Sequence, residues 1–218
     1  MKHIPILFST PMVQAIQEGR KSQTRREVNF PMVWPDLLED LHSKLVVKGK
    51  EVFDLSGENR MTLRDRFGKP GDVLWVRETW ATDYLNDCFS PSQLPADTEL
   101  YFFASSERRS EGKWRPSIHM PKWACRIFLK VKSVRVERLQ DISQEDATAE
   151  GIKPCDRVKG FENWWTDYSA NSIRCFAFPI ASFSTLWISI NGKESWDSNP
   201  WVWVVEFERC EKPTNFAD

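Results

Sequence analysis

The stretch Trp123–Glu137, which reads WACRIFLKVKSVRVE, alternates over a long span. Its apolar residues Ile127, Leu129 and Val131 recur at every second position, which is the period of a β-strand. Lys130 stands between the last two of them, so one face of the strand is apolar and the other is partly charged. A strand of this length and pattern favours a sheet that can curl toward a small barrel.

Shorter segments on both sides of this stretch carry strand, turn or helix signals. The further strands that we expect are His3–Phe8, Val73–Val76, Leu100–Phe103 and Trp201–Phe207, with a hairpin or irregular arm over Val46–Leu55 and a turn over Trp196–Pro200. The expected helices run from Ser9 to Gly19, over Asp36–Leu45, from Ser143 to Gly151 and over Pro179–Ile190. Helices and strands do not alternate regularly, which favours the α+β class and a partly closed mixed β-barrel over a doubly wound sheet.

The composition indicates one soluble globular domain over residues 1–218. The chain is 41% hydrophobic, and 30 Lys and Arg residues stand against 31 Asp and Glu residues, a formal charge of −1. A protein that holds long duplex DNA by bulk electrostatics usually carries an excess of Lys and Arg, so that class is not expected. The apolar runs, such as Trp201–Val205, are too short to span a bilayer, and we see no signal peptide.

Cysteine and histidine patterns speak against a metal centre. The five cysteines show no C-x-x-C pair, which predicts reduced thiols in a cytoplasmic protein and no cysteine-based zinc site. His3, His42 and His119 are scattered without ligand spacing. We therefore expect neither a metal nor a cofactor.

The most polar and basic stretch of the N-terminal third is Gly19–Arg26, GRKSQTRR. Such a stretch can be a solvated basic loop or a phosphate contact, but it also holds groups that amide hydrolysis needs. Thr24 offers a hydroxyl, and Lys21 shares a face with it if the segment makes one helical turn. Repulsion from the neighbouring arginines would lower the pKa of Lys21, and partial burial of its side chain would lower it further. A lysine with a lowered pKa can act as a base.

The spacing Gly-x-Lys-x-x-Thr-x-Arg in this stretch resembles the signature of the ASCH family, whose members have a PUA-like barrel fold. The usual family signature has Glu where Thr24 stands here. Short bacterial ASCH proteins that hydrolyse N4-acetylcytidine share that Thr and use a Glu on a helix, which matches Glu150 in this chain. The resemblance extends to a longer phage or prophage subgroup, and leaves residues 29–69, 81–113 and 153–178 as insertions.

The resemblance implies a metal-independent amidohydrolase that converts N4-acetylcytidine, or related N4-acylated cytosine nucleosides, to cytidine and a carboxylate. Lys21, Thr24 and Glu150 would be catalytic. Either neutral Lys21 activates Thr24 while Glu150 orients the base, or Glu150 activates a water while Lys21 and Thr24 hold the oxyanion. The alternatives are an ASCH module that binds RNA without catalysis and an ASCH-type ribonuclease, with RNA as the partner in both.

Several other residues are candidates for lining the substrate pocket. These are Arg20, Arg26, Arg77, Trp80, Arg115, Ser117 and His119. Trp80 offers a stacking wall, and His119 can read a base edge or a sugar hydroxyl. A nucleophilic Ser117–His119 pair is not expected, because no third orienting group is evident. Glu78 is expected to pair with an arginine for structural reasons.

Overall fold

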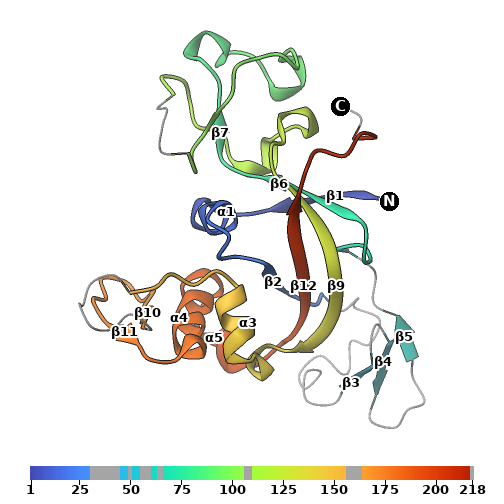
Figure 1. The fold of residues 1–218 in the computed structure, drawn as a ribbon, viewed down its shortest axis with the longest axis vertical. Helices are drawn as coiled ribbons and strands as arrows, with labels where there is room; N and C mark the ends of the chain where they lie inside the picture. The colour runs from blue at the N-terminus through green and yellow to red at the C-terminus, as the bar shows by residue number, and fades with distance from the viewer. Residues whose placement is uncertain are drawn as a thin grey trace. The chain divides into compact units, whose positions relative to one another are not determined.

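The computed structural model describes residues 1–29, 45–48, 51–54, 60–62, 66–105, 110–155 and 164–216 (Figure 1). It is a mixed α+β structure built around a five-stranded mixed sheet with short helices. The strands of this sheet, in spatial order, are β1 (His3–Leu7), β6 (Val73–Arg77), β9 (Phe128–Arg138), β12 (Trp201–Cys210) and β2 (Gln23–Glu27). No helix among the described residues is long and apolar enough to cross a bilayer.

The chain divides into two compact units. Unit 1 comprises Met1–Gly19, Phe67–Lys132 and Phe207–Asp218, and unit 2 comprises Arg20–Arg66 and Ser133–Glu206. The long strands β9 and β12 each contribute residues to both units. We describe each unit by itself.

Unit 1 is organised by the pairing of β1 with β6. The two strands are parallel, with Ile4 opposite Leu74, and β6 runs antiparallel to β9. Helix α1 (Thr10–Gln17) begins with a proline in its first turn, and Gly19 after it adopts a positive φ of 74°. The other elements are β7 (Trp80–Ala81), β8 (Tyr101–Phe102) and the 3-10 turns η2 (Tyr84–Asn86), η3 (Pro91–Gln93), η4 (Ser117–His119) and η5 (Lys122–Ala124).

Unit 2 packs helices against the β12–β2 pair. These strands are antiparallel, with Val204 opposite Arg25 and Val205 opposite Thr24. Its helices are α3 (Gln144–Ala149), α4 (Pro179–Asn191), α5 (Lys193–Asp197) and the 3-10 turn η6 (Leu139–Asp141). Val202 and Val204 form a buried cluster with Phe183 of α4. The remaining strands are β10 (Trp165–Thr166) and β11 (Cys175–Phe176), and the three-stranded sheet of β3 (Leu45–Lys48), β4 (Glu51–Asp54) and β5 (Arg60–Thr62).

Most expected elements are present, and the differences have local causes. The strand expected over Trp123–Glu137 starts only at Phe128, because residues 122–124 form a 3-10 turn after Pro121. Within the expected turn Trp196–Pro200, the first two residues belong to α5, and Asn199 makes the turn with a φ of 46°. The helix expected over Asp36–Leu45 lies outside the described residues, except that Leu45 begins β3.

Two cysteines depart from the expected reduced state. Cys155 and Cys175 form a disulfide with their Cα atoms 6.0 Å apart. Backbone pairing brings them together, because Pro154 bridges to Trp165 and the next residue, Thr166, pairs with Cys175. This pairing across 20 residues is not visible in the cysteine spacing, so the expectation was wrong for this pair. The free cysteines of the described chain are Cys88, Cys125 and Cys210.

Candidate functional site

The predicted catalytic segment is extended and not helical. Gln23–Glu27 forms β2, and Lys21, just before it, makes an isolated antiparallel bridge with Glu150. The Ser22 N–H donates to the Ala149 carbonyl at 2.9 Å. The helical turn that would put Lys21 and Thr24 on one face is therefore absent. Residues 20–22 instead run along the end of α3.

Helix α3 places Glu150 at its C-terminal end. Ser143 caps its first turn by accepting a hydrogen bond from the Asp146 N–H at 3.1 Å. Glu150 is the C-cap residue, and Gly151 beyond it has a φ of 86°, a left-handed conformation that glycine adopts without strain. The chain thus leaves the helix and pairs at once with the segment before β2.

Lys21 and Glu150, 129 residues apart in sequence, form a buried ion pair. Lys21 Nζ donates to Glu150 Oε2 at 2.9 Å and to the Glu150 carbonyl at 2.8 Å. Their side chains are only 1% and 6% exposed. Burial lowers the pKa of Lys21, Glu150 raises it, and Arg26 and Arg25 lower it, so the pKa lies below the usual value for lysine. Two oxygens of one residue therefore hold the Lys21 amino group out of contact with solvent.

Arg25 is the centre of a charged cluster on the helix-facing side of β2. Its NH1 donates to Glu150 Oε1 at 3.2 Å, and its NH2 donates to Glu137 Oε1 at 2.5 Å and to Asp146 Oδ2 at 2.9 Å. The Arg25 guanidinium also lies 5.9 Å from the ring centroid of Phe183 on α4. Because its side chain is 0% exposed, these contacts take the place of water at NH1 and NH2, whereas Nε has no hydrogen-bond partner among the described residues.

Sequence reasoning noted Arg25 only as a source of repulsion and missed its partners. The sequence does hold a signal for these contacts, because polar residues two apart on a strand lie on the same face. Gln23 and Arg25 have this spacing on β2, and Arg135 and Glu137 have it on β9. The Arg25 NH1 donates to Gln23 Oε1 at 2.5 Å, and Arg135 Nε donates to Glu137 Oε2 at 2.9 Å. On α3, Asp146 stands four residues before Glu150 and so faces the same side.

Thr24 lies on the other side of the strand. Because side chains alternate along β2, Thr24 and Arg26 face away from the side that holds Gln23 and Arg25. Thr24 is 1% exposed, and its hydroxyl makes no hydrogen bond with another residue of the described chain. Arg20 binds the segment that follows α3: its NH1 donates to the Gly151 carbonyl at 2.6 Å.

The other candidate pocket residues belong to unit 1 and make structural contacts there. Arg77 donates to the Ile118 carbonyl. Arg115 lies 5.4 Å from the Trp80 ring centroid and donates to the Phe89 and Asn86 carbonyls, each at 2.9 Å. Trp80 is 0% exposed, although its indole Nε1 has no hydrogen-bond partner among the described residues. The two remaining candidates lie in the turn η4, where Ser117 is half-buried and His119 is exposed.

Glu78 confirms the structural pairing expected of it. Its carboxylate is 1% exposed and binds Arg126, whose Nε donates to Oε1 at 2.8 Å and whose NH2 donates to Oε2 at 2.9 Å. Arg126 NH1 donates to Ser105 at 2.8 Å, and its guanidinium stacks over the Phe102 ring at 4.0 Å. All three nitrogens of Arg126 are therefore engaged.

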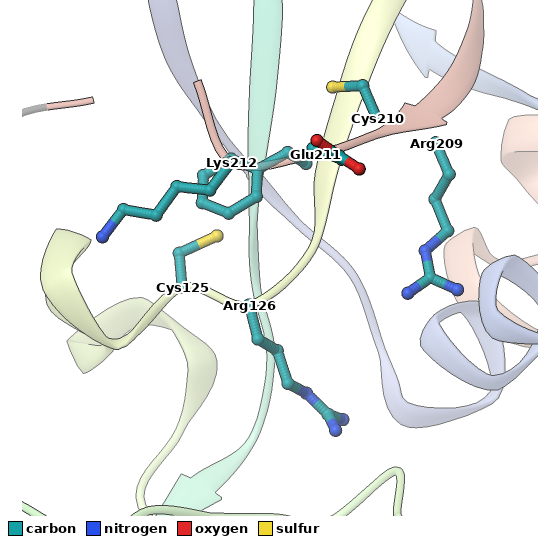
Figure 2. Close-up of a pocket in the computed structure, with 7 residues that line it drawn as sticks. Cys125, Arg126, Arg209, Cys210, Glu211 and Lys212 are labelled. Carbon is teal, nitrogen blue, oxygen red and sulfur yellow. The ribbon is translucent and has the colours of Figure 1, made fainter. Parts of the chain in front are cut away.

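Unit 1 also has a cavity of about 690 Å³ that is wide open to solvent (Figure 2). It is lined by Cys125, Arg126, Phe128, Arg209, Cys210, Glu211 and Lys212, none of them a predicted site residue. Burial raises the pKa of Cys125 to about 11, and burial also raises the pKa of Cys210. Both thiols therefore stay protonated near neutral pH, and neither is an activated nucleophile.

Comparisons with protein-family models, with curated proteins and with solved structures find no match to this chain. Among the residues that the structure describes, no group of three or more His, Cys, Asp or Glu side chains is placed to hold a metal ion. The buried Lys21–Glu150 pair and the Arg25 cluster around it thus form the candidate functional site.

Proposed function

We propose that this chain is a metal-independent amidohydrolase of the ASCH type, with a PUA-like mixed barrel, that removes the acyl group from N4-acetylcytidine or related N4-acylated cytosine nucleosides. The observation that carries the proposal is the buried Lys21–Glu150 pair, whose atoms Nζ and Oε2 are 2.9 Å apart. Burying two charges is costly, and a lysine with a lowered pKa in such a pair is typical of functional sites. The resemblance of Gly19–Arg26 to the ASCH signature supplies the substrate class.

In the proposed reaction, neutral Lys21 takes the proton of the Thr24 hydroxyl. The Thr24 oxygen forms a bond to the acyl carbon, the bond from that carbon to N4 of the cytosine breaks, and the Lys21 ammonium returns its proton to N4. Cytidine leaves, and water hydrolyses the ester on Thr24 to give the carboxylate and the free hydroxyl. Thr24 faces away from the side of β2 that holds Arg25, and Arg25 and Lys21 both bind Glu150. The first step therefore requires the segment from Lys21 to Thr24 to rearrange, so that Lys21 Nζ reaches the Thr24 hydroxyl.

The contacts of Glu150 support this version over the one in which Glu150 activates a water. Its Oε2 accepts a hydrogen bond from Lys21, and its Oε1 accepts one from Arg25. A carboxylate held by a cation on each oxygen is better suited to orienting groups than to accepting a proton. The lowered pKa of Lys21 favours the same assignment of roles.

Two further features bear on the substrate. The formal charge of −1 suits a small nucleoside better than a polymer of phosphates. Lys21 and Thr24 are 4% and 1% exposed, so a nucleoside reaches them only when the residues over them move aside. We therefore expect opening of the site to contribute to the measured rate.

The test is hydrolysis of N4-acetylcytidine by the purified protein, followed by the ultraviolet spectrum with and without a chelator. We expect release of cytidine in both conditions. Lys21→Ala, Thr24→Ala and Glu150→Ala should each lower kcat/KM by about 10² or more, because each removes a group from the proton transfer or its orientation. Glu145→Ala, which changes an exposed glutamate on the same helix as Glu150, should retain activity.

Undiminished activity in Thr24→Ala would exclude Thr24 as the nucleophile, and undiminished activity in all three variants would end the proposal. Circular dichroism spectra must show that the inactive variants are folded. If the unaltered protein binds or cleaves labelled RNA and hydrolyses no acylated cytidine, the binding-module or ribonuclease alternative replaces the amidohydrolase.

A further inference from the structure

Arg25 and Lys21 each bind one oxygen of the Glu150 carboxylate. Arg25 NH1 lies 3.2 Å from Oε1, and Lys21 Nζ lies 2.9 Å from Oε2. The two cations stand four residues apart in the sequence, and each binds a different oxygen of the carboxylate. Glu150 thus has one partner that can release a proton and one that cannot, since a guanidinium stays charged in proteins.

The position of Arg25 is fixed by contacts that do not involve Lys21. Its NH2 binds Glu137 on β9 and Asp146 on α3, at 2.5 and 2.9 Å. Arg135 holds these same two carboxylates, with Nε on Glu137 at 2.9 Å and NH2 on Asp146 at 2.6 Å. Arg25 is therefore oriented whether or not Lys21 carries its proton.

This arrangement matters when Lys21 becomes neutral. If Lys21 were the only partner of Glu150, loss of its proton would leave a buried carboxylate, 6% exposed, without a counter-charge. An uncompensated buried charge is strongly unfavourable, so the proton would stay on Lys21. With Arg25 on Oε1, the carboxylate remains paired.

We propose that Arg25 is a positioning residue of the site: by holding Oε1 of Glu150 it keeps this carboxylate in place and compensated while Lys21 gives up and regains a proton. The assignment rests on the proposed amidohydrolase function. It concerns a residue that the Gly-x-Lys-x-x-Thr-x-Arg spacing leaves unspecified. Lysine could not replace Arg25, because one ammonium cannot bind three carboxylates with the planar geometry of the guanidinium.

The charges around Lys21 give the direction of the expected effect. On Lys21 itself, burial lowers the pKa, Glu150 raises it, and Arg26 and Arg25 lower it. The next shell holds Glu137 and Asp146 beside Arg25; beyond them, Arg135 contacts Glu206 on β12, and Arg20 lies near Tyr168. Removing Arg25 takes away a repulsion and leaves Lys21 as the cation hydrogen-bonded to Glu150, with Arg26 as a further charge that acts on this carboxylate. Both changes raise the pKa of Lys21.

The experiment measures the pH profile of kcat/KM with N4-acetylcytidine and, separately, the titration of Lys21 by the ¹³Cε resonance of labelled lysine, assigned with Lys21→Arg. In Arg25→Gln we expect the rising limb of the profile and the Lys21 titration to move together to higher pH. We expect activity to fall about tenfold at neutral pH and to recover in part at alkaline pH. Arg25→Lys should resemble Arg25→Gln in rate, because lysine lacks the planar guanidinium that binds several carboxylates at once.

Arg135→Gln is the matched control. It removes the same charge from the same cluster, but Arg135 contacts Glu137, Asp146 and Glu206 and neither member of the Lys21–Glu150 pair. Its Lys21 titration should stay close to that of the unaltered protein. If Arg25→Gln does not fold, Arg25→Gln combined with Glu137→Gln removes one charge of each sign and should show the same shift.

The outcomes separate the two proposals. Turnover by the unaltered protein with an unmoved profile and titration in Arg25→Gln overturns the role of Arg25 alone. Equal shifts in Arg25→Gln and Arg135→Gln also overturn it, because the effect is then one of overall charge. No turnover by the unaltered protein overturns the amidohydrolase, whatever the NMR titration shows.

Discussion

Glu78 and Arg126 show how a buried charge in this chain is matched by a specific partner. Glu78 in unit 1 is 1% exposed and has both oxygens bound by Arg126. A carboxylate at that depth has lost its water, so its burial is tolerable only while the guanidinium remains. Cys125, close in sequence to Arg126, shows the contrasting solution: its pKa is raised to about 11 by burial, and it stays neutral.

Arg126→Met should lower the free energy of unfolding by about 3 kcal/mol, because it strands the Glu78 carboxylate. Glu78→Gln combined with Arg126→Met should restore a large part of this loss, since no buried charge is left unpaired. Urea unfolding at neutral pH measures both. Arg209→Met is the control: Arg209 lines the same cavity but is exposed and unpaired among the described residues, so we expect a change below about 0.5 kcal/mol. A larger loss in Arg209→Met than in Arg126→Met would contradict the argument.

Helix α3 is the element that delivers Glu150, and it is short. It spans Gln144–Ala149, six residues, too few to be stable through its own hydrogen bonds. It depends on the Ser143 cap and on packing against α4, where Ile142 and Ala147 join the buried cluster around Phe183. The location of Glu150 is thus set by a cap at one end and a left-handed glycine at the other.

Ser143→Ala should therefore lower the free energy of unfolding by about 1 kcal/mol, through loss of the hydrogen bond from the Asp146 N–H. Ser143→Asp should retain most of the stability, because aspartate caps helices about as well as serine. Thermal unfolding of the two variants compares them directly. A Ser143→Ala protein as stable as the parent would show that the cap is not needed to hold α3.

The elements that sequence predicts correctly are those whose signals are local. Ser143 and Gly151 mark the ends of α3, and Pro179 and Gly192 mark those of α4, because capping depends only on neighbouring residues. Strand β2 was missed, since Gln23–Glu27 is polar and becomes a strand through pairing with β12. Pairing of distant segments leaves no trace in local composition.

The candidate site follows the same division. The Lys21–Glu150 contact could be expected because both positions match the ASCH resemblance, and the structure places the two side chains in contact. The partners of Arg25 could not, because Glu137 and Asp146 lie 112 and 121 residues away in sequence. Only the fold brings these carboxylates to one arginine.

The formal charge of the whole molecule is only −1, but individual carboxylates in both units have pKa values shifted by their surroundings. In unit 1 the backbone N–H of Lys2 donates to Asp72 at 2.7 Å, and this hydrogen bond lowers the pKa of Asp72 against the opposing effect of burial. In unit 2 burial raises the pKa of Asp146, but hydrogen bonds from Arg25 and Gln23 outweigh it, so that the pKa is again lowered.

Each lowered pKa makes stability depend on pH in a definite direction. The unfolded chain binds protons at an ordinary aspartate pKa of about 3.9, above that of the folded state. The stabilisation is therefore complete above about pH 5 and is lost as the pH falls through 4 toward the folded pKa. Both units should therefore weaken in acid.

Asp72→Asn tests this dependence in the unit that lacks the proposed site. We expect it to lower the free energy of unfolding by about 1–2 kcal/mol at pH 7, because a charged acceptor becomes a neutral one, and to make the decline between pH 5 and pH 3 shallower. Urea unfolding at each pH gives both quantities. Asp97→Asn removes an exposed carboxylate and should parallel the unaltered protein over the same range. If Asp72→Asn declines in acid as steeply as the unaltered protein, the hydrogen bonds from Lys2 and Lys69 do not account for the acid sensitivity of unit 1.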